Sequence, residues 1–161
     1  MQNFNITKNF TYNELTKTKH KDLLKLNREQ GLLFTDKMRL IVNYILQPTR
    51  NRYGLPVIIN SGFRSLKLHY YIYGLNNKIR KAMGLKPIAV PLQSQHLEAE
   101  AVDFYVKGYD LKKVFDWIQC TLIFGQVILY VDENFIHISL PTLKNNGQVM
   151  IFENGKYRRL K

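Results

Sequence analysis

The chain has 161 residues, of which 45% are apolar and 22% charged, a balance typical of one folded globular domain that excludes wholesale disorder and fibrous architecture. Lysine and arginine number 24 against 12 acidic residues, and the resulting charge of +12 would attract nucleic acid, anionic lipid or a cell-wall polymer rich in phosphate and carboxylate. The longest apolar run, 127–131, has about five residues against the roughly 20 that a membrane-spanning helix needs, and a single cysteine excludes an internal disulfide.

The first third of the chain favours helices. A short helix is expected to open at Thr11 or Asn13, since both residues can cap a helix start. Apolar residues recur at helical spacing over 35–46, which indicates an amphipathic helix, and Pro48 predicts that this helix ends soon after Leu46.

A short strand and a basic segment come next. The β-branched run 57–59, bounded by a proline and a glycine, indicates a buried strand, and a loop carrying Ser61 and Arg64 follows it. Residues 66–93 then hold five basic residues, several tyrosines and no acidic residue. We favour the interpretation that this insertion is a partly helical surface excursion with solvated lysines. The alternative is a basic and aromatic surface for nucleic acid.

The rest of the chain favours strands around one helix. A strand is expected over 102–106, and a helical period follows over 110–123, where Cys120 lies in an apolar stretch that predicts a core thiol. Two hairpins are then expected, because a short polar turn and an Asn-Gly pair each separate two β-like runs. These elements predict a single α+β domain over 1–161, with helices packed on a mostly antiparallel sheet.

Two of the four histidines have a carboxylate to share. His20 and His69 have no acidic partner close in sequence, and we interpret them as surface or packing residues. His96 precedes Asp103 by seven residues, and His137 lies inside a predicted strand. Two imidazoles and a carboxylate form a set that binds Zn²⁺ with a fourth position open to water. The set by itself is a weak signal, since chance spacing produces it often.

The segments around these residues carry more information. Residues 59–65 resemble a Ser-Gly-Tyr-Arg-Ser segment, and residues 94–103 resemble a Ser-x-His-x-x-Gly-x-Ala-x-Asp motif. Residues 124–130 resemble a Phe-Asp-Gln-Leu-Ile strand, and residues 135–139 a Trp-Val-His-Val-Ser strand. These four patterns, in the same order, are typical of the zinc D-Ala-D-Ala carboxypeptidase family, which includes VanY-type peptidases and phage endolysins. The sequence therefore resembles that family. The resemblance covers roughly 10–139 and is closest to the short members found in phages and prophages.

The resemblance implies a fold and a set of roles. The implied fold is the α+β sandwich shared by these DD-peptidases and the Hedgehog signalling domain. The implied zinc ligands are His96, Asp103 and His137, and Arg64 would steady the substrate as negative charge develops. Substrate-binding residues are expected within the matching segments, namely Ser61, Ser94 and Tyr130.

Three departures from the family pattern bear on activity. Family members place a Glu or His shortly before the last ligand as the base, and the candidates here are Asp132 and Glu133, both in an expected hairpin turn. Ala99 stands where the family has Gly, which is harmless at a negative φ and costly at a positive one. Gly125 stands where the family has Asp, which removes a carboxylate that could orient the site.

The expected function is therefore a zinc peptidase that cuts peptidoglycan stem or cross-link peptides and is attracted to anionic wall polymer by its charge. No secretion signal is visible at the start of the sequence, which favours release from a host cytoplasm to the wall, or carriage in a virion, as a phage or prophage lysis or wall-remodelling enzyme. The alternative is a weakened family member that serves as a wall-binding or virion structural module. Nucleic-acid binding is the least favoured reading.

Overall fold

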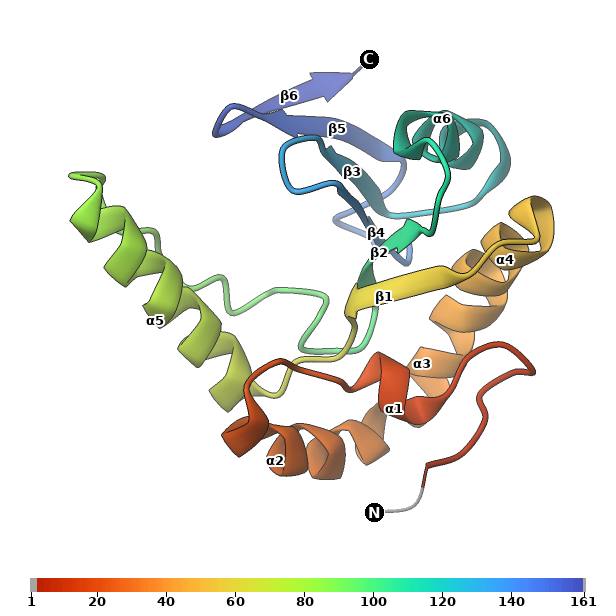
Figure 1. Cartoon of the computed structure of the whole chain (residues 1–161), viewed down its shortest axis with the longest axis horizontal. Coiled ribbons are helices and arrows are strands. Elements are labelled where there is room, and N and C mark those ends of the chain that lie inside the picture. Colours follow the sequence, from red (N-terminus) through yellow and green to blue (C-terminus); the bar gives the residue numbers. More distant parts are fainter. Residues whose placement is uncertain (1–2, 161) are drawn as a thin grey trace.

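The computed structural model describes residues 3–160 and shows an α+β fold with a six-stranded, mostly antiparallel sheet, as the sequence predicted (Figure 1). The helical elements are α1 (Tyr12–Leu15), α2 (Lys21–Gly31), η1 (Leu32–Phe34), α3 (Thr35–Ile41), η2 (Val42–Leu46), α4 (Gln47–Tyr53), α5 (Leu66–Ala82) and α6 (Leu111–Thr121). The strands are β1 (Val57–Ser61), β2 (Ala101–Val106), β3 (Gln126–Tyr130), β4 (Phe135–Ser139), β5 (Gln148–Glu153) and β6 (Lys156–Leu160). Their order in the sheet is β1-β2-β4-β3-β5-β6, and only β3 and β5 pair in parallel.

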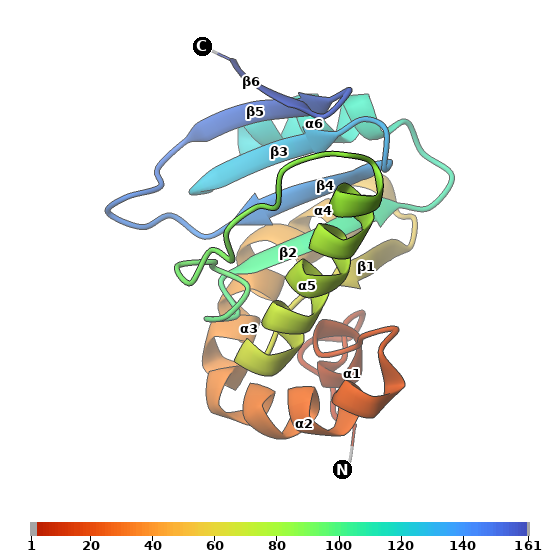
Figure 2. The same ribbon diagram turned by 90° about the vertical axis from the view of Figure 1, so that its left-hand side faces the viewer.

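The two faces of the sheet differ in character. Alternate residues of the central strands are fully buried and share one hydrophobic core with α3, η2 and α6, among them Val102, Phe104, Ile136 and Ile138. Figure 2 shows α3, α4 and α6 behind the sheet and α5 in front of it. Because side chains alternate along a strand, the residues between these core positions face the α5 side.

The helix predicted over 35–46 continues to Tyr53, so the predicted end at Pro48 is wrong. Proline lacks an N–H, and its ring would clash with the carbonyl of Tyr44 in a regular α-helix. The π-helical segment η2 lies just before Pro48 and widens the helix at that point, which lets the chain continue as α4. The helix ends instead at Gly54, whose φ of 66° is the left-handed conformation that glycine adopts most readily.

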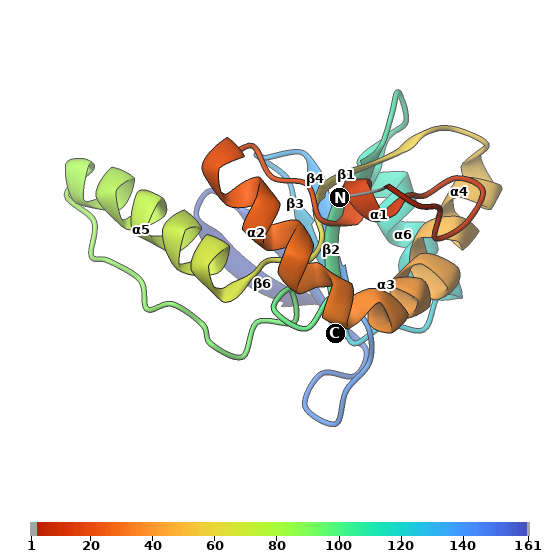
Figure 3. The ribbon, with the colours of Figure 1, turned by 90° about the horizontal axis from the view of Figure 1, so that it is seen from below.

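Residues 66–93 consist of α5 and the loop that returns from it. Ser65 caps the helix by accepting a hydrogen bond from the Leu68 N–H. Helix α5 extends away from the other elements (Figures 1 and 3), and Leu68 and His69 in its first turn are its buried residues. Its lysines are exposed, which agrees with the favoured interpretation of a surface excursion.

Both predicted hairpins are present. In the second, Asn154 and Gly155 adopt φ values of 51° and 72° between β5 and β6, as an Asn-Gly turn requires. The prediction for Cys120 is wrong, because the buried side of α6 is formed by Leu111, Val114, Phe115 and Ile118, and Cys120 lies on the exposed side. Within the described chain, no helix combines the length and the apolar character needed to cross a membrane.

Candidate metal centre

The pairing of β2 with β4 brings two of the predicted ligands together. Asp103 and His137 are direct partners in this antiparallel pair, so their side chains leave the same face of the sheet. His137 Nδ1 lies 2.8 Å from Asp103 Oδ1. The register of the sheet therefore joins two residues that are 34 positions apart in the sequence.

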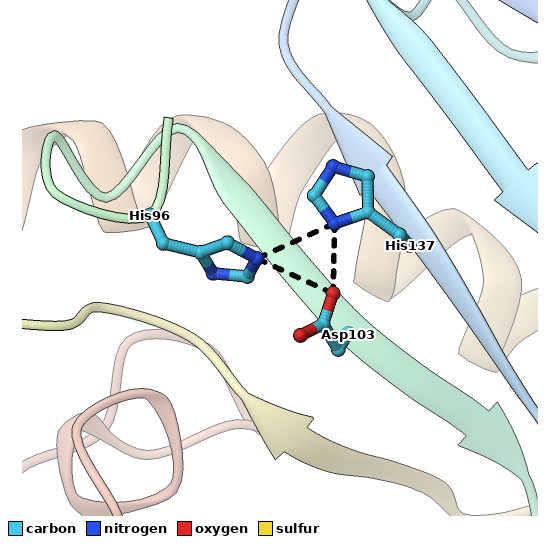
Figure 4. Close-up of side chains that lie close together, drawn as sticks. All are labelled: His96, Asp103 and His137. Atoms are coloured by element: carbon cyan, nitrogen blue, oxygen red, sulfur yellow. Dashed lines mark hydrogen bonds and ion pairs between the residues drawn. The ribbon is translucent and has the colours of Figure 1, made fainter. Parts of the chain in front are cut away.

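His96 reaches the same point from a loop rather than from a strand. Its Nδ1 lies 2.8 Å from the carbonyl oxygen of Gly62, and its own carbonyl accepts a hydrogen bond from the Arg64 N–H at 3.0 Å. These two contacts fasten the loop before β2 to the loop after β1. His96 Nε2 then lies 3.3 Å from both His137 Nδ1 and Asp103 Oδ1 (Figure 4).

The three facing atoms fit a tetrahedral metal ion. Zinc bonds of about 2.0–2.2 Å at tetrahedral angles set neighbouring ligand atoms about 3.3 Å apart. The observed separations are 2.8, 3.3 and 3.3 Å, and the group formed by His96, Asp103 and His137 can hold a metal ion. One further position of the tetrahedron would face the cavity described below.

The protonation states of His96 and Asp103 also favour a bound metal ion. A carbonyl oxygen can only accept, so the neutral His96 ring carries its proton on Nδ1 and leaves a lone pair on Nε2. Burial, and after it the charge of nearby Arg64, lowers the pKa of His96 to about 4, which keeps the ring neutral at pH 7. Burial would raise the pKa of Asp103, but the charge that His96 gains in acid and the hydrogen bond from His137 outweigh it and hold the pKa well below its ordinary value. A lone pair and a carboxylate oxygen thus face each other at 3.3 Å, an arrangement that a cation would stabilise.

Arg64 holds the carboxylate of the group. Its Nη2 donates to Asp103 Oδ2 at 2.6 Å, and its Nε donates to Ser61 Oγ at 2.8 Å. The second oxygen of Asp103 is therefore fixed by a charge-assisted hydrogen bond while the first faces the histidines. In this arrangement Arg64 orients the ligand Asp103. The contact of Arg64 with substrate stays a prediction.

The ligand atoms lie at the base of a cavity of about 450 Å³ between the sheet and α5. Ser94 and Tyr130, two of the predicted substrate-binding residues, line this cavity, whereas Ser61 lies in an adjoining one. Tyr130 is paired with Tyr157 of β6 through their hydroxyl oxygens at 2.9 Å. Burial, followed by this hydrogen bond, raises the pKa of Tyr130 above its ordinary value, so its phenol stays protonated.

The structure does not bring the candidate bases to the ligands. Asp132 and Glu133 are exposed in the turn between β3 and β4, and neither lines the cavity. The Asp132 carboxylate accepts a hydrogen bond from the Asn154 N–H at 2.7 Å, which ties the turn to the neighbouring hairpin. Both carboxylates are thus placed as turn residues, and the base role predicted for them has no contact with the site to support it.

The other two departures from the family pattern have structural consequences. Ala99 has a φ of 54°, so the predicted strain of an alanine at this point is present, and its side chain is buried in the core. Gly125 has no room for a side chain, because a Cβ would collide with the carbonyl oxygens of Leu140 and Asn145. A carboxylate at 125 is therefore incompatible with this packing.

The sequence did not indicate several supporting residues. Asn27 is fully buried, accepts from the Ser65 N–H and donates to the carbonyl oxygens of Thr16 and Phe63, which anchors the loop that carries Arg64. Gly62 passes so close to the backbone of Leu15 that a Cβ would collide with it. Tyr73 and Tyr157 line the cavity from α5 and β6. Of these residues, only Gly62 could have been found from the sequence, because it lies in the 59–65 segment that resembles the family motif.

The comparisons with known proteins add a similarity to a solved structure. No protein-family model matches the chain, and no curated protein matches it in sequence. Among solved structures it is similar to a mutant of the vancomycin resistance D,D-pentapeptidase VanY in complex with Zn(II), at 23% identity and a TM-score of 0.41. The similarity covers 50% of this chain and 53% of that one, so about half of the solved chain is matched. The metal assignment therefore rests on the geometry of the three ligands.

Proposed function

We propose that this protein is a zinc metallopeptidase that hydrolyses a peptide bond in peptidoglycan stem or cross-link peptides. The observation that supports the proposal is the ligand triangle of His96, Asp103 and His137, with separations that suit tetrahedral zinc, at the base of an open polar cavity. The ordered resemblance of four segments to the zinc D-Ala-D-Ala carboxypeptidase family supports the choice of substrate.

The residues of the cavity have distinct tasks in this proposal. A bound zinc ion would lower the pKa of a water molecule toward 7 and polarise the carbonyl of the bond to be cut. Arg64 holds the second oxygen of Asp103 and orients the carboxylate, and the Gly62 carbonyl fixes the ring of His96. The protonated phenol of Tyr130 can donate a hydrogen bond to a substrate oxygen, as can the hydroxyl of Ser94.

The proposal extends to the setting of the reaction. A charge of +12 would hold the protein on anionic wall polymer between encounters with stem peptides. The resemblance to short phage and prophage enzymes supports a role in lysis or wall remodelling, with release from the host cytoplasm or carriage in a virion.

The first test is the metal content of protein purified without chelator, measured by plasma mass spectrometry beside the His137→Ala variant. We expect about one zinc per chain in the wild type, as for a single catalytic site, and loss of it in the variant. Purified sacculi incubated with the wild type should release peptides, and those incubated with the variant should not. Protein that binds no zinc, and whose behaviour does not change on substitution of His137, would overturn the proposal.

One observation favours a second candidate function. Among the described residues that line the cavity, Asp103 is the sole carboxylate, and it is engaged by Arg64 and His137. A site without a free base suits a wall-binding or virion structural module that retains the metal. Zinc binding and retention on sacculi without peptide release would favour this function over the peptidase.

A further inference from the structure

The cavity above the metal centre shares lining residues with two neighbouring cavities, and we call the three together the groove. Arg64, Ile72 and Asn76 line both this cavity and a neighbouring one of about 440 Å³ beside the N-terminal segment. At the opposite end, four polar residues line both the central cavity and a third one beside the loop at 142–145, namely Gln93, Ser94, Gln95 and Asn145. The groove therefore continues on both sides of His96, Asp103 and His137.

The first side of the groove is basic, and we call it the basic arm. One wall carries Lys17, Lys19 and His20, and the other is the apolar side of α5, with Leu68 and Leu75. Neither lysine forms an ion pair with a described residue, and no acidic side chain lines this arm within residues 3–160. Free cations opposite an apolar wall can bind a peptide whose side chains carry carboxylates.

The opposite side of the groove carries no excess of positive charge. Glu98 and Glu100 line it, and their carboxylates lie 3.0 and 2.9 Å from Lys37 Nζ, so two acidic groups share one lysine. Lys144 Nζ donates to Gln93 Oε1 at 3.4 Å. Lys37 and Lys144 together balance the two glutamates on this side, so the groove is asymmetric, with its excess positive charge on the Lys17 side.

The central cavity lacks the group that a carboxypeptidase needs. Such an enzyme holds the free terminal carboxylate of its substrate with a cation close to the metal. Apart from the two histidine ligands, Arg64 is the cation that lines the central cavity in the described chain, and it is committed to Asp103 and Ser61. A further cavity adjoins the central one on each side and shares lining residues with it, which leaves room for chain on both sides of the metal centre.

We propose that the groove binds an interior stretch of an acidic peptide chain, with the acidic residues in the basic arm, so that the protein acts as an endopeptidase. This inference rests on the proposed function. In the reaction the C–N bond of an internal amide breaks and the oxygen of a water molecule joins the carbonyl carbon. Both protons of the water go to the leaving nitrogen, so the products carry a new carboxylate and a new ammonium group. Both products are peptides of two or more residues.

The first experiment identifies the products from muramidase-treated peptidoglycan by mass spectrometry. We expect fragments of two or more residues on both sides of the cut, and the same cut in peptides whose terminal carboxylate has been amidated. Release of single carboxyl-terminal residues alone would overturn the inference while leaving the zinc peptidase proposal intact. If wild-type protein releases nothing, the proposed function fails, and the binding experiment decides the inference.

The binding experiment uses the zinc-loaded protein and a fluorescein-labelled hexapeptide with three glutamates and an amidated carboxyl end. Lys17→Glu/Lys19→Glu should weaken its binding at least tenfold in fluorescence anisotropy. The control is Lys8→Glu/Lys107→Glu, which changes the net charge equally at exposed positions that do not line the groove. It should change the affinity less than twofold.

The outcomes of the binding experiment are distinct. Equal losses in the two double variants would show attraction by overall charge and would overturn the basic arm. Equal binding of the glutamine version of the peptide would overturn it as well. Binding of the free-acid peptide without binding of the amidated one would overturn an interior stretch of chain as the occupant.

Discussion

Strands β2 and β4 have core residues on one face and the candidate metal ligands on the other. On one face, Phe104 and Ile136 are fully buried against the helices. On the other face, Asp103 and His137 form the metal centre below an open cavity. Residues adjacent in sequence thus differ completely in what their loss would do, because the strand turns one toward the core and the next toward the cavity. Four substitutions test this division.

The largest effect on zinc affinity is expected for His137→Ala, which removes one ligand from the cavity face. A complete zinc site is worth about 10–16 kcal/mol, so one ligand contributes about 3 kcal/mol, or at least about 100-fold in affinity. Competition with a fluorescent zinc chelator measures this loss. His20→Ala is the matched control, since His20 lies outside the ligand group, and an equal loss there would contradict the division.

On the core face, Ile136→Ala should lower the stability of the fold and leave zinc binding intact. Removal of a fully buried isoleucine costs about 2–5 kcal/mol because it leaves a cavity in the core. Urea unfolding of the zinc-free protein should show this loss, and the folded fraction should still bind zinc with unchanged stoichiometry. A variant that remains stable but binds no zinc would show that the two faces are not separate.

Arg64→Gln should give a smaller loss on the cavity face. Residues that orient metal ligands change metal affinity by about 10–100-fold, because the ligand then samples other orientations. Calorimetric titration with zinc measures the change. Arg39→Gln at an exposed position of α3 serves as the control for the lost charge, and it should leave the affinity unchanged.

The smallest effect is expected for Ala99→Gly, since Ala99 joins the loop of His96 to the core. Relief of the left-handed conformation gains about 1–2 kcal/mol. The lost methyl burial costs about 0.8 kcal/mol, and the added chain entropy costs about 0.5–1 kcal/mol. Thermal unfolding should therefore change by less than about 1 kcal/mol, and a loss of several would mean that the methyl group has a packing role beyond its size.

Local features of the fold were predictable from the sequence. Thr11 forms the capping box of α1, and the Asn-Gly turn closes the hairpin of β5 and β6, since both depend on residues that are neighbours in the chain. The continuation of the helix past Pro48 was not predictable, because the π-helical segment that admits the proline depends on packing of Val42, Ile45 and Leu46 in the core. Cys120 was misplaced because composition alone does not tell which side of a helix is buried.

For the candidate site, the presence of two histidines and an aspartate was only a weak indication of a metal site. The four segments that resemble the peptidase family, in the family's order, made His96, Asp103 and His137 the predicted ligands. The sequence could not show that Arg64 is committed to Asp103, or that Asp132 and Glu133 lie outside the cavity. These facts depend on strand register and on where a turn projects, which are set by contacts between distant parts of the chain.

The sequence by itself therefore determined which residues can bind a metal, which segments form helices and strands, and that the protein carries a large positive charge. Only the tertiary structure decided that the excess positive charge near the site lies on one side of the central cavity, with Arg64 already engaged at its centre. The physical reason is that metal ligation depends on side-chain chemistry, which sequence records, whereas the length and charge of a groove depend on which surfaces of α5, the N-terminal segment and the sheet meet.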